Sequence, residues 1–406
     1  MIPNFFPPLT IVVPRRAESP PSVPRSINPK VLALFPLGTT RRYVVIGDSP
    51  LATGGSAAVW KVWTPEGNEA ALKIHNIGIE LLGYSKTEAK NLKLIKGGPS
   101  IVNHQDDFEL EPTKYGDDVH ENLHIDDDTP RHAILMDLLP CKDTHDLFMG
   151  GGDAISFDDL MCLAKQGLEA LVYLQSKQMV HKDLKPENCA YDQARKKLTI
   201  FDFATALVGK KLSPNDLLGT TFCYRAPEAI LGMYCDGGLD VWSLGMVLFE
   251  LYTKSRLFNI NEEQGELSLL HLIQRTTDQG FSEGFAHLAP FRRRYFEVNI
   301  SGKFVFDERG FCKLISCPDK QLLKKLVLPY LQMAREYPNE VLWHARIRAA
   351  TKCRGGRESE STQLIALLDG MLKIEQRINA AQALEQFFAA DLTSPPKKRK
   401  ENSTQK

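Results

Sequence analysis

The sequence predicts an α+β protein of two lobes, a small β-rich lobe over residues 31–139 and a larger, mainly helical lobe over residues 140–390. Two short apolar strands favour the small lobe: Ala70–Ile74, interrupted by a single cation, and Arg131–Leu135. Apolar residues at helical spacing predict the large lobe, which should open with a helix from about Phe157 to Ser176.

The most informative feature is a polar run of eight residues, His181–Asn188. It places a potential general base (Asp183), a cation (Lys185) and a metal-binding amide (Asn188) within six residues. An apolar strand follows and ends in Asp202. Phosphoryl transfer requires this combination, because a carboxylate orients the hydroxyl, a cation lies near the γ-phosphate, and acidic and amide groups bind Mg²⁺. The alternative interpretation is a polar loop between two strands.

This run resembles the catalytic loop of eukaryotic protein kinases. The resemblance implies a bilobal fold, in which an antiparallel sheet and one main helix, αC, form the small lobe. It also implies two ion pairs, Lys73 with Glu88 and Arg377 with Glu228. Further landmarks stand in the family's order over about three hundred residues: Lys73, Glu88, Ala226-Pro227-Glu228, Asp240-Val241-Trp242 and Arg377.

The resemblance implies ATP and Mg²⁺ as cofactors and proteins as substrates. Lys73 would hold the α- and β-phosphates, and Glu88 would hold Lys73. Asp183 would orient the hydroxyl, while Lys185 would neutralise the γ-phosphate. The metal ligands would be Asn188 and Asp202. Without the resemblance, a lysine at a strand end, such as Lys73, is usually a solvated surface group.

A glycine-rich loop and a hinge would enclose the nucleotide. The loop corresponds to Ala52–Val59, which keeps one of three family glycines, Gly54. Glycine lets backbone N–H groups approach phosphate oxygens, although this stretch also has the sequence of a hairpin turn. Met136 resembles the gatekeeper, and the backbone of Asp137–Leu139 would receive adenine. The predicted nucleotide-site residues are Ala52, Gly54, Gly55, Ser56, Val59, Ala71, Lys73, Glu88, Asp137, Leu139 and Ala190.

Three residues depart from the family's pattern. Lys182 replaces an arginine and lacks the bidentate fork that holds a phosphate on the activation segment. Ala204 replaces the glycine after Phe203, which removes backbone freedom at a hinge. Ala190 replaces a leucine beneath adenine and should leave a roomier nucleotide floor. Since none of these changes removes a group that touches the metals or the phosphoryl, the sequence favours an active enzyme. A catalytically weak or inactive kinase-like scaffold is the alternative.

The activation segment indicates the subgroup. Thr221–Glu228 resembles the CMGC group of cyclin-dependent, mitogen-activated, dual-specificity tyrosine-regulated and homeodomain-interacting kinases. Arg225 matches that group's arginine before Ala-Pro-Glu, which implies a preference for proline after the phosphorylated residue, and Lys185 favours serine/threonine specificity. The group also carries an insert, here over about residues 275–360. Within it, Arg292-Arg293-Arg294 is either a docking site or a solvated helix face.

Composition agrees with a globular intracellular enzyme. The 406 residues include 50 basic and 50 acidic side chains, so direct nucleic-acid or membrane binding is not expected. No apolar run approaches the roughly 20 residues that span a bilayer. Prolines interrupt the N-terminal apolar stretch, so a signal peptide is not expected either. The eight cysteines are scattered, which predicts reduced thiols.

Three segments are predicted to be solvated. Residues 1–30 contain eight prolines and form a disordered arm. Residues 106–128 contain ten acidic side chains and form an insertion between strands, with a binding role as the alternative. Residues 391–406 form a disordered basic tail. This tail resembles a nuclear-import signal, which implies that an import receptor binds it. The protein would then be located in the nucleus, and secondarily in the cytoplasm. The alternative is a tail that only increases solubility. The signal's cations are Lys397, Lys398, Arg399 and Lys400.

Overall fold

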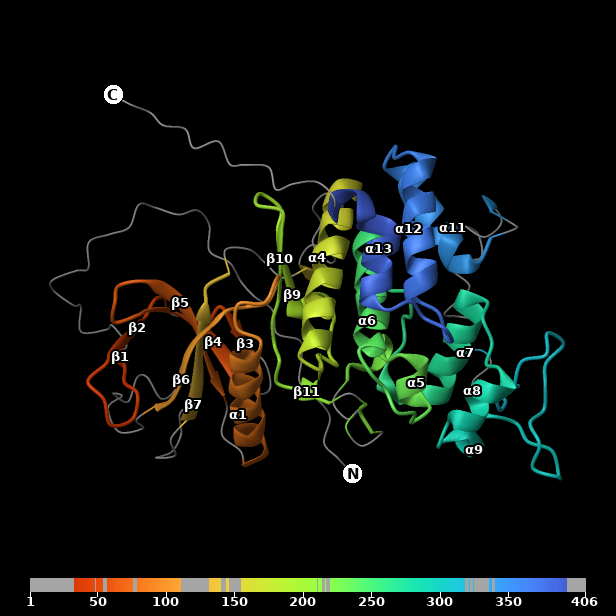
Figure 1. The fold of residues 1–406 in the computed structure, drawn as a ribbon, viewed down its shortest axis with the longest axis horizontal. Coiled ribbons are helices and arrows are strands. Elements are labelled where there is room, and N and C mark those ends of the chain that lie inside the picture. Colours follow the sequence, from red (N-terminus) through yellow and green to blue (C-terminus); the bar gives the residue numbers. More distant parts are fainter. Residues whose placement is uncertain are drawn as a thin grey trace.

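A small β-rich lobe and a larger helical lobe lie side by side, as the sequence predicts (Figure 1). The predicted arm, the tail from residue 393 onward and most of the acidic insertion lie outside the described residues. The computed structural model describes residues 33–47, 49–53, 57–75, 79–110, 131–139, 144–145, 155–209, 211–213, 216, 220–317, 321, 324, 336–337 and 340–392.

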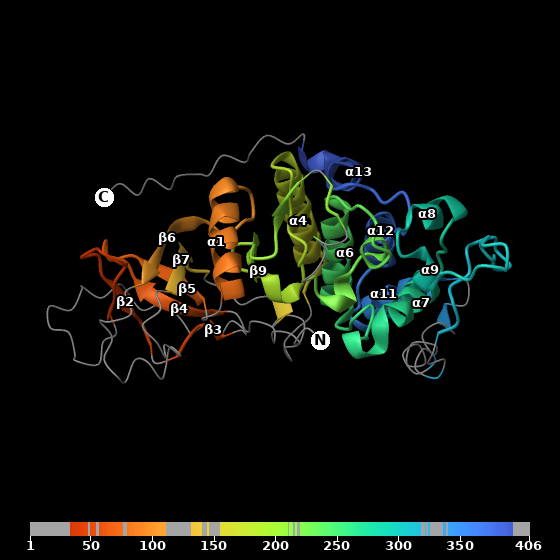
Figure 2. The same ribbon diagram turned by 90° about the horizontal axis from the view of Figure 1, so that it is seen from below.

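The small lobe is an antiparallel sheet with the strand order β1-β2-β4-β5-β7-β6, in which β3 also pairs with β4. Helix α1 lies between this sheet and the large lobe (Figure 2). Side chains alternate between the two faces of a strand. On β5, Ala70, Leu72 and Ile74 therefore join the lobe's apolar core, whereas Lys73 and His75 lie on the opposite face. The lobe's elements are β1 Ala33–Leu34, β2 Tyr43–Val45, β3 Ala52–Thr53, β4 Ala57–Trp63, β5 Glu69–His75, α1 Ile79–Leu94, β6 His104–Leu110 and β7 Arg131–Asp137.

The acidic insertion begins later than predicted, because residues 106–110 continue strand β6 and pair with β7. Strand β6 is at the edge of the sheet, where polar side chains are common. Such side chains obscure the alternation of apolar and polar residues by which a strand is recognised in a sequence. One of its acidic residues is an anchor for α1: the Asp107 carboxylate lies 2.6 Å from Lys93 Nζ.

The large lobe is built around two long helices, α4 and α6, which lie side by side with α12 and α13 (Figure 1). Helix α4 has the predicted bounds, and the Ser156 hydroxyl accepts the Asp159 N–H at its start. A Cβ at Gly167 would lie 2.9 Å from Leu244, so glycine allows the close contact of α4 with α6.

The helical lobe also contains short strands and 3₁₀ turns. Its elements are α4 Phe157–Ser176, β8 Met179–Val180, η2 Pro186–Asn188, β9 Cys189–Asp192, β10 Lys197–Ile200, β11 Leu207–Val208, η4 Phe222–Tyr224, α5 Pro227–Ile230, α6 Gly238–Thr253, η5 Glu262–Gln264, α7 Gly265–Thr277, α8 Glu283–Leu288, α9 Arg292–Tyr295, α11 Leu342–Cys353, α12 Glu358–Met371 and α13 Ala380–Leu392.

The predicted insert near residues 275–360 contains folded elements, among them α8, α9 and α11. Helix α11 belongs to the core, because Trp343 is only 1% exposed and its ring packs edge-on against Phe249 of α6. In α9, Arg293 and Arg294 are exposed, in keeping with a solvated helix face.

Two further findings concern the described segments alone. No helix there is both long and apolar enough to cross a bilayer. No disulfide joins the cysteines within those segments.

We expect Trp343→Ala to lower the free energy of unfolding by about 3–5 kcal/mol, because it leaves a cavity between α11 and α6. Urea unfolding should show a lower midpoint with an unchanged m value. The control is Lys352→Ala on the exposed side of the same helix, where a surface change costs within about 0.5 kcal/mol. Equal effects of the two substitutions would show that α11 does not belong to the core.

Candidate active site

A buried ammonium joins three elements at the boundary between the lobes. Lys73 Nζ of β5 lies 2.9 and 2.8 Å from the two carboxylate oxygens of Glu88 on α1. The same nitrogen lies 2.9 Å from Oδ1 of Asp202, which follows β10. The Lys73 and Glu88 side chains are almost fully buried, whereas that of Asp202 is 30% exposed. The predicted Lys73–Glu88 ion pair is thus present and extends to Asp202.

Mutual attraction keeps these three groups charged. Burial works to lower the pKa of Lys73, but the Asp202 and Glu88 carboxylates outweigh it and raise that pKa. Burial works in the opposite direction on Glu88, whose pKa is nonetheless lowered by Lys73. The pKa of Asp202 is lowered to about 2, since the attraction of Lys73 exceeds the penalty of burial. Asp202 is therefore ionised at neutral pH.

Asp183 is the centre of a second cluster, in the predicted catalytic loop. Its Oδ2 accepts from Lys185 Nζ at 2.8 Å and from Asn188 Nδ2 at 3.2 Å. Its Oδ1 accepts from the Thr221 hydroxyl at 2.5 Å, and Lys185 Nζ also donates to that hydroxyl at 3.0 Å. Burial opposes the charge of Lys185, but Asp183 dominates and raises the lysine's pKa. The activation segment, which begins at Asp202, thus closes onto the catalytic loop through Thr221.

A buried carboxylate on α6 holds the catalytic loop in place. Asp240 accepts the backbone N–H groups of His181 at 2.7 Å and Lys182 at 2.9 Å. Lys182 has a φ of 73°, a conformation that non-glycine residues rarely adopt, so these two bonds stabilise an unfavourable backbone. The Lys182 side chain is itself buried, which lowers its pKa even though Asp216, Asp183 and Asp240 attract it.

Phe203 and Arg225 fix the two ends of the activation segment. Phe203 is fully buried and packs edge-on against His181, while its carbonyl accepts from Asn91 of α1 at 3.1 Å. Arg225 donates through Nε and Nη2 to the Thr220 carbonyl at 3.2 and 3.1 Å. The guanidinium is held on its other side by two carboxylates, Glu262 at 3.2 Å and Glu266 at 3.1 Å.

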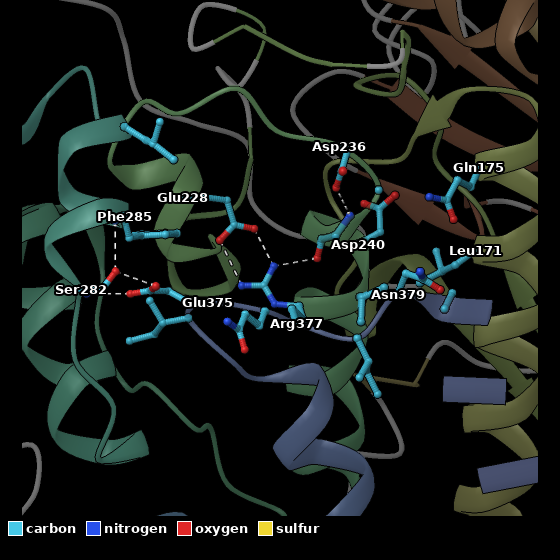
Figure 3. A pocket seen from close by; sticks show the side chains of 18 of the residues that line it. Leu171, Gln175, Glu228, Asp236, Asp240, Ser282, Phe285, Glu375, Arg377 and Asn379 are labelled. Atoms are coloured by element: carbon cyan, nitrogen blue, oxygen red, sulfur yellow. Dashed lines mark hydrogen bonds and ion pairs between the residues drawn. The ribbon is translucent and has the colours of Figure 1, made fainter. Parts of the chain in front are cut away.

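The second predicted ion pair is also present. Arg377 lies 2.5 and 3.0 Å from the two carboxylate oxygens of Glu228. The pair borders a cavity of about 710 Å³ between α4, α6, α8 and the segment that joins α12 to α13. Asp240 lines the same cavity, and Ser282 pairs with Glu375 on its opposite wall (Figure 3). Lys73 and Asp183 do not line this cavity, so it does not open onto the two charged clusters.

The donor set fits Mg²⁺, although two protein ligands would leave most of the ion's positions to other oxygen ligands. Asp202 offers an ionised carboxylate, and Asn188 uses its amide nitrogen for Asp183, which leaves its amide oxygen for a cation. Within the described residues, no group of three or more His, Cys, Asp or Glu side chains could hold a metal without such help.

The structure places the remaining predicted nucleotide residues as follows. Ala52 pairs with Val59, and Val59 pairs with Lys73 across the strands beside the buried ammonium. Ala71 pairs with Met136, after which Asp137 ends β7 and Leu139 packs on the large core. Gly54, Gly55 and Ser56 lie outside the described residues.

Ala190, the residue predicted to lie beneath adenine, is fully buried. Side chains of the large core enclose it. One further residue of the site was not predicted from the sequence: His75, whose Nε2 lies 3.2 Å from Glu88 Oε2. Its only signal in the sequence is its spacing, two residues after Lys73, which puts both side chains on one face of β5.

Comparison with known proteins decides the family, because the protein kinase domain matches residues 48–389. The chain belongs to the protein kinase domain family. This kinase domain is 26% identical over 230 residues to a probable casein kinase II subunit alpha homolog of Encephalitozoon cuniculi, covering 54% of this chain and 68% of that protein. It is 30% identical over 201 residues to cyclin-dependent kinase G-2 of Oryza sativa subsp. indica.

A third relative is cyclin-dependent kinase 12 of Caenorhabditis elegans, 30% identical over 215 residues. These matches cover 45% and 51% of this chain, but only 28% of either cyclin-dependent kinase. The relatives agree with the CMGC group that the activation segment predicts. A crystal structure of a kinase domain has a TM-score of 0.58 at 20% identity, over 84% of this chain and 94% of that one, and supports the fold.

The kinase domain contains a buried carboxyl group whose titration is measurable. Glu250 of α6 is 1% exposed and accepts the Tyr224 hydroxyl at 2.7 Å. Burial raises its pKa from 4.5 to about 7. A raised pKa means that the folded state favours the protonated form. Its contribution to stability is therefore complete below about pH 4.5 and is lost as the pH rises through about 7.

We expect Glu250→Gln, which stays neutral, to be more stable than the wild type at pH 8, with an advantage that shrinks by about 2–3 kcal/mol at pH 5. Urea unfolding at the two pH values measures this difference. An advantage that is the same at both would mean that Glu250 keeps an ordinary pKa. Glu283→Gln, at an exposed carboxylate on α8, is the control and should show no such pH dependence.

Proposed function

We propose that this chain is a serine/threonine kinase that transfers the γ-phosphoryl group of Mg-ATP to protein hydroxyls. The observation that carries this proposal is the arrangement of two neighbouring charged clusters at the boundary between the lobes. Lys73 is paired with Glu88 and Asp202, and Asp183 is paired with Lys185. Such an arrangement has a positive group for phosphate on one side and a proton acceptor for a hydroxyl on the other.

The residues divide the chemistry as follows. The Asp183 carboxylate orients the substrate hydroxyl and accepts its proton as the new oxygen–phosphorus bond forms and the bond to ADP breaks. Lys185, already 2.8 Å from Asp183, neutralises charge on the transferred group. Lys73 holds the α- and β-phosphates. Asn188 and Asp202 would hold Mg²⁺, which when bound would supply positive charge to the phosphate groups.

A catalytically weak scaffold is the competing proposal, based on Lys182, Ala204 and the glycine-poor loop. The site geometry favours the active enzyme over the scaffold. Ala204 stands where the family has glycine, yet Phe203 is buried and Asp202 faces Lys73. Lys182 keeps its backbone bond to Asp240.

Asp202→Ala should reduce phosphoryl transfer at least about a thousandfold, because it removes the charged metal ligand. Asp183→Asn should cause a comparable loss, since it removes the proton acceptor. Initial rates with radiolabelled ATP and a generic protein substrate measure both. The control, Asp278→Asn at an exposed carboxylate, should retain full activity. Near-normal transfer by Asp202→Ala would exclude the proposed metal site, and an inactive wild type would favour the scaffold.

We further propose that the enzyme prefers proline directly after the phosphorylated residue. Arg225 occupies the Thr220 carbonyl, which then cannot accept an N–H from a bound peptide. Any residue other than proline would leave its N–H unpaired at that position, at a cost of about 1–3 kcal/mol.

Peptides with Ser-Pro should therefore be phosphorylated with a kcat/KM about tenfold or more above matched peptides with Ser-Ala. Arg225→Gln loses the two-point contact with the Thr220 carbonyl. It should therefore lower the ratio of kcat/KM for Ser-Pro peptides to kcat/KM for Ser-Ala peptides. Equal turnover of the two peptides by the wild type would refute the preference without affecting the proposed kinase activity.

We also propose that the basic tail directs the protein to the nucleus, on the basis of the four cations Lys397–Lys400. A fluorescent fusion truncated after Thr393 should lose nuclear enrichment in eukaryotic cells. A control fusion with the four cations replaced by glutamine should behave in the same way. An unchanged distribution of both would leave the tail as a solubilising segment.

A further inference from the structure

Two buried histidines connect the sheet of the small lobe to helix α1. His75 ends β5 and His132 lies near the start of β7, with exposures of only 4% and 6%. The two strands pair so that Ile74 is opposite Ala133, which brings the histidines next to each other on one face of the sheet. Helix α1 covers that face, so both rings point toward the helix.

His75 contacts the Glu88 carboxylate, which also forms the ion pair with Lys73. Its Nε2 lies 3.2 Å from Glu88 Oε2. Lys73 lowers the pKa of Glu88 despite its burial, so the carboxylate is ionised and can only accept. His75 therefore donates through Nε2. Its Nδ1 is buried and has no hydrogen-bond partner among the described residues, so this donation is the ring's one hydrogen bond there.

The second histidine contacts the same helix one turn earlier. The Ser85 hydroxyl, which is fully buried, is hydrogen-bonded to His132 Nδ1. Nε2 of His132 faces Asp107 Oδ2 at 3.4 Å. Since the carboxylate accepts, Nε2 carries the proton and Nδ1 accepts from Ser85. Residues three apart lie on one face of a helix, so Ser85 and Glu88 bring the same side of α1 to the sheet.

The need for a second donor to Glu88 follows from the chemistry of Lys73. Its ammonium is shared between Glu88 and Asp202, and nucleotide phosphates would compete for it as well. Keeping a buried carboxylate ionised costs free energy when its cationic partner is shared with other anions. The buried ring N–H of His75 supplies Glu88 with a second donor, so the glutamate stays in place while Lys73 turns toward the nucleotide.

We propose that His75 is a positioning residue for nucleotide binding, which acts by holding Glu88 toward Lys73 while His132 anchors the preceding turn of α1. The inference rests on the proposed function, because it assigns His75 to the site that would bind Mg-ATP.

The test measures Mg-ATP affinity of the full chain by calorimetry, together with KM and kcat. His75→Leu removes the donor at similar volume and should weaken Mg-ATP binding about tenfold or more, mainly through KM. His75→Gln keeps an N–H at a similar reach and should restore most of that affinity. His271→Leu removes a histidine that binds a backbone carbonyl of the large lobe, and it should leave affinity within about twofold.

A double-mutant cycle distinguishes positioning from simple loss of stability. If His75 acts through Glu88, adding His75→Leu to Glu88→Ala should change Mg-ATP affinity by less than about twofold, whereas independent effects would multiply. Where Glu88→Ala binds too weakly to measure, hydrogen exchange of the α1 amides is compared in the same four proteins. His75→Leu alone should speed that exchange, and in the Glu88→Ala background it should add little.

Wild-type affinity in His75→Leu, failure of His75→Gln to restore binding, or multiplicative effects in the cycle would each overturn the inference. A wild-type chain that does not bind Mg-ATP would instead overturn the proposed function. The two failures are therefore distinguishable.

Discussion

The Lys73 ammonium is the interaction on which the rest of the site depends. It joins β5, α1 and the start of the activation segment through two carboxylates, Glu88 and Asp202. Burial alone would favour neutral groups at all three positions, so each charge persists only because the others are present. Moving α1 or the activation segment would leave a buried charge without its partner. The orientation of the two lobes and the state of the site are thereby linked.

Helix α6 performs the corresponding task in the large lobe. It is buried on all sides, and its polar residues face segments that carry the chemistry. Asp240 binds two backbone N–H groups of the catalytic loop, and Glu250 binds Tyr224 of the activation segment. Because unpaired buried polar groups are costly, these contacts fix loops that have little regular structure of their own. A buried, mainly apolar helix thus positions the loops that carry the chemistry of the kinase domain.

Much of this site was predictable because its residues lie close together in the sequence or match family landmarks. Asp183, Lys185 and Asn188 share one loop, and the Lys73–Glu88 and Glu228–Arg377 pairs were expected from the resemblance. Predictions failed where polar residues serve in regular structure. Residues 106–110 are an edge strand although they look like a solvated loop.

The sequence by itself determined the chemistry: which carboxylates, amides and cations are present, and in what order along the chain. Only the tertiary structure decided which of them share a partner. His75 and Glu88 are separated by 13 residues, and Arg225 and Glu266 by 41. Contacts of this kind depend on strand register and on where a helix packs, both set by burial of apolar surface across the whole lobe. A sequence motif therefore identifies the reacting groups, whereas the packing of the folded chain determines which groups surround each of them and whether each is ionised.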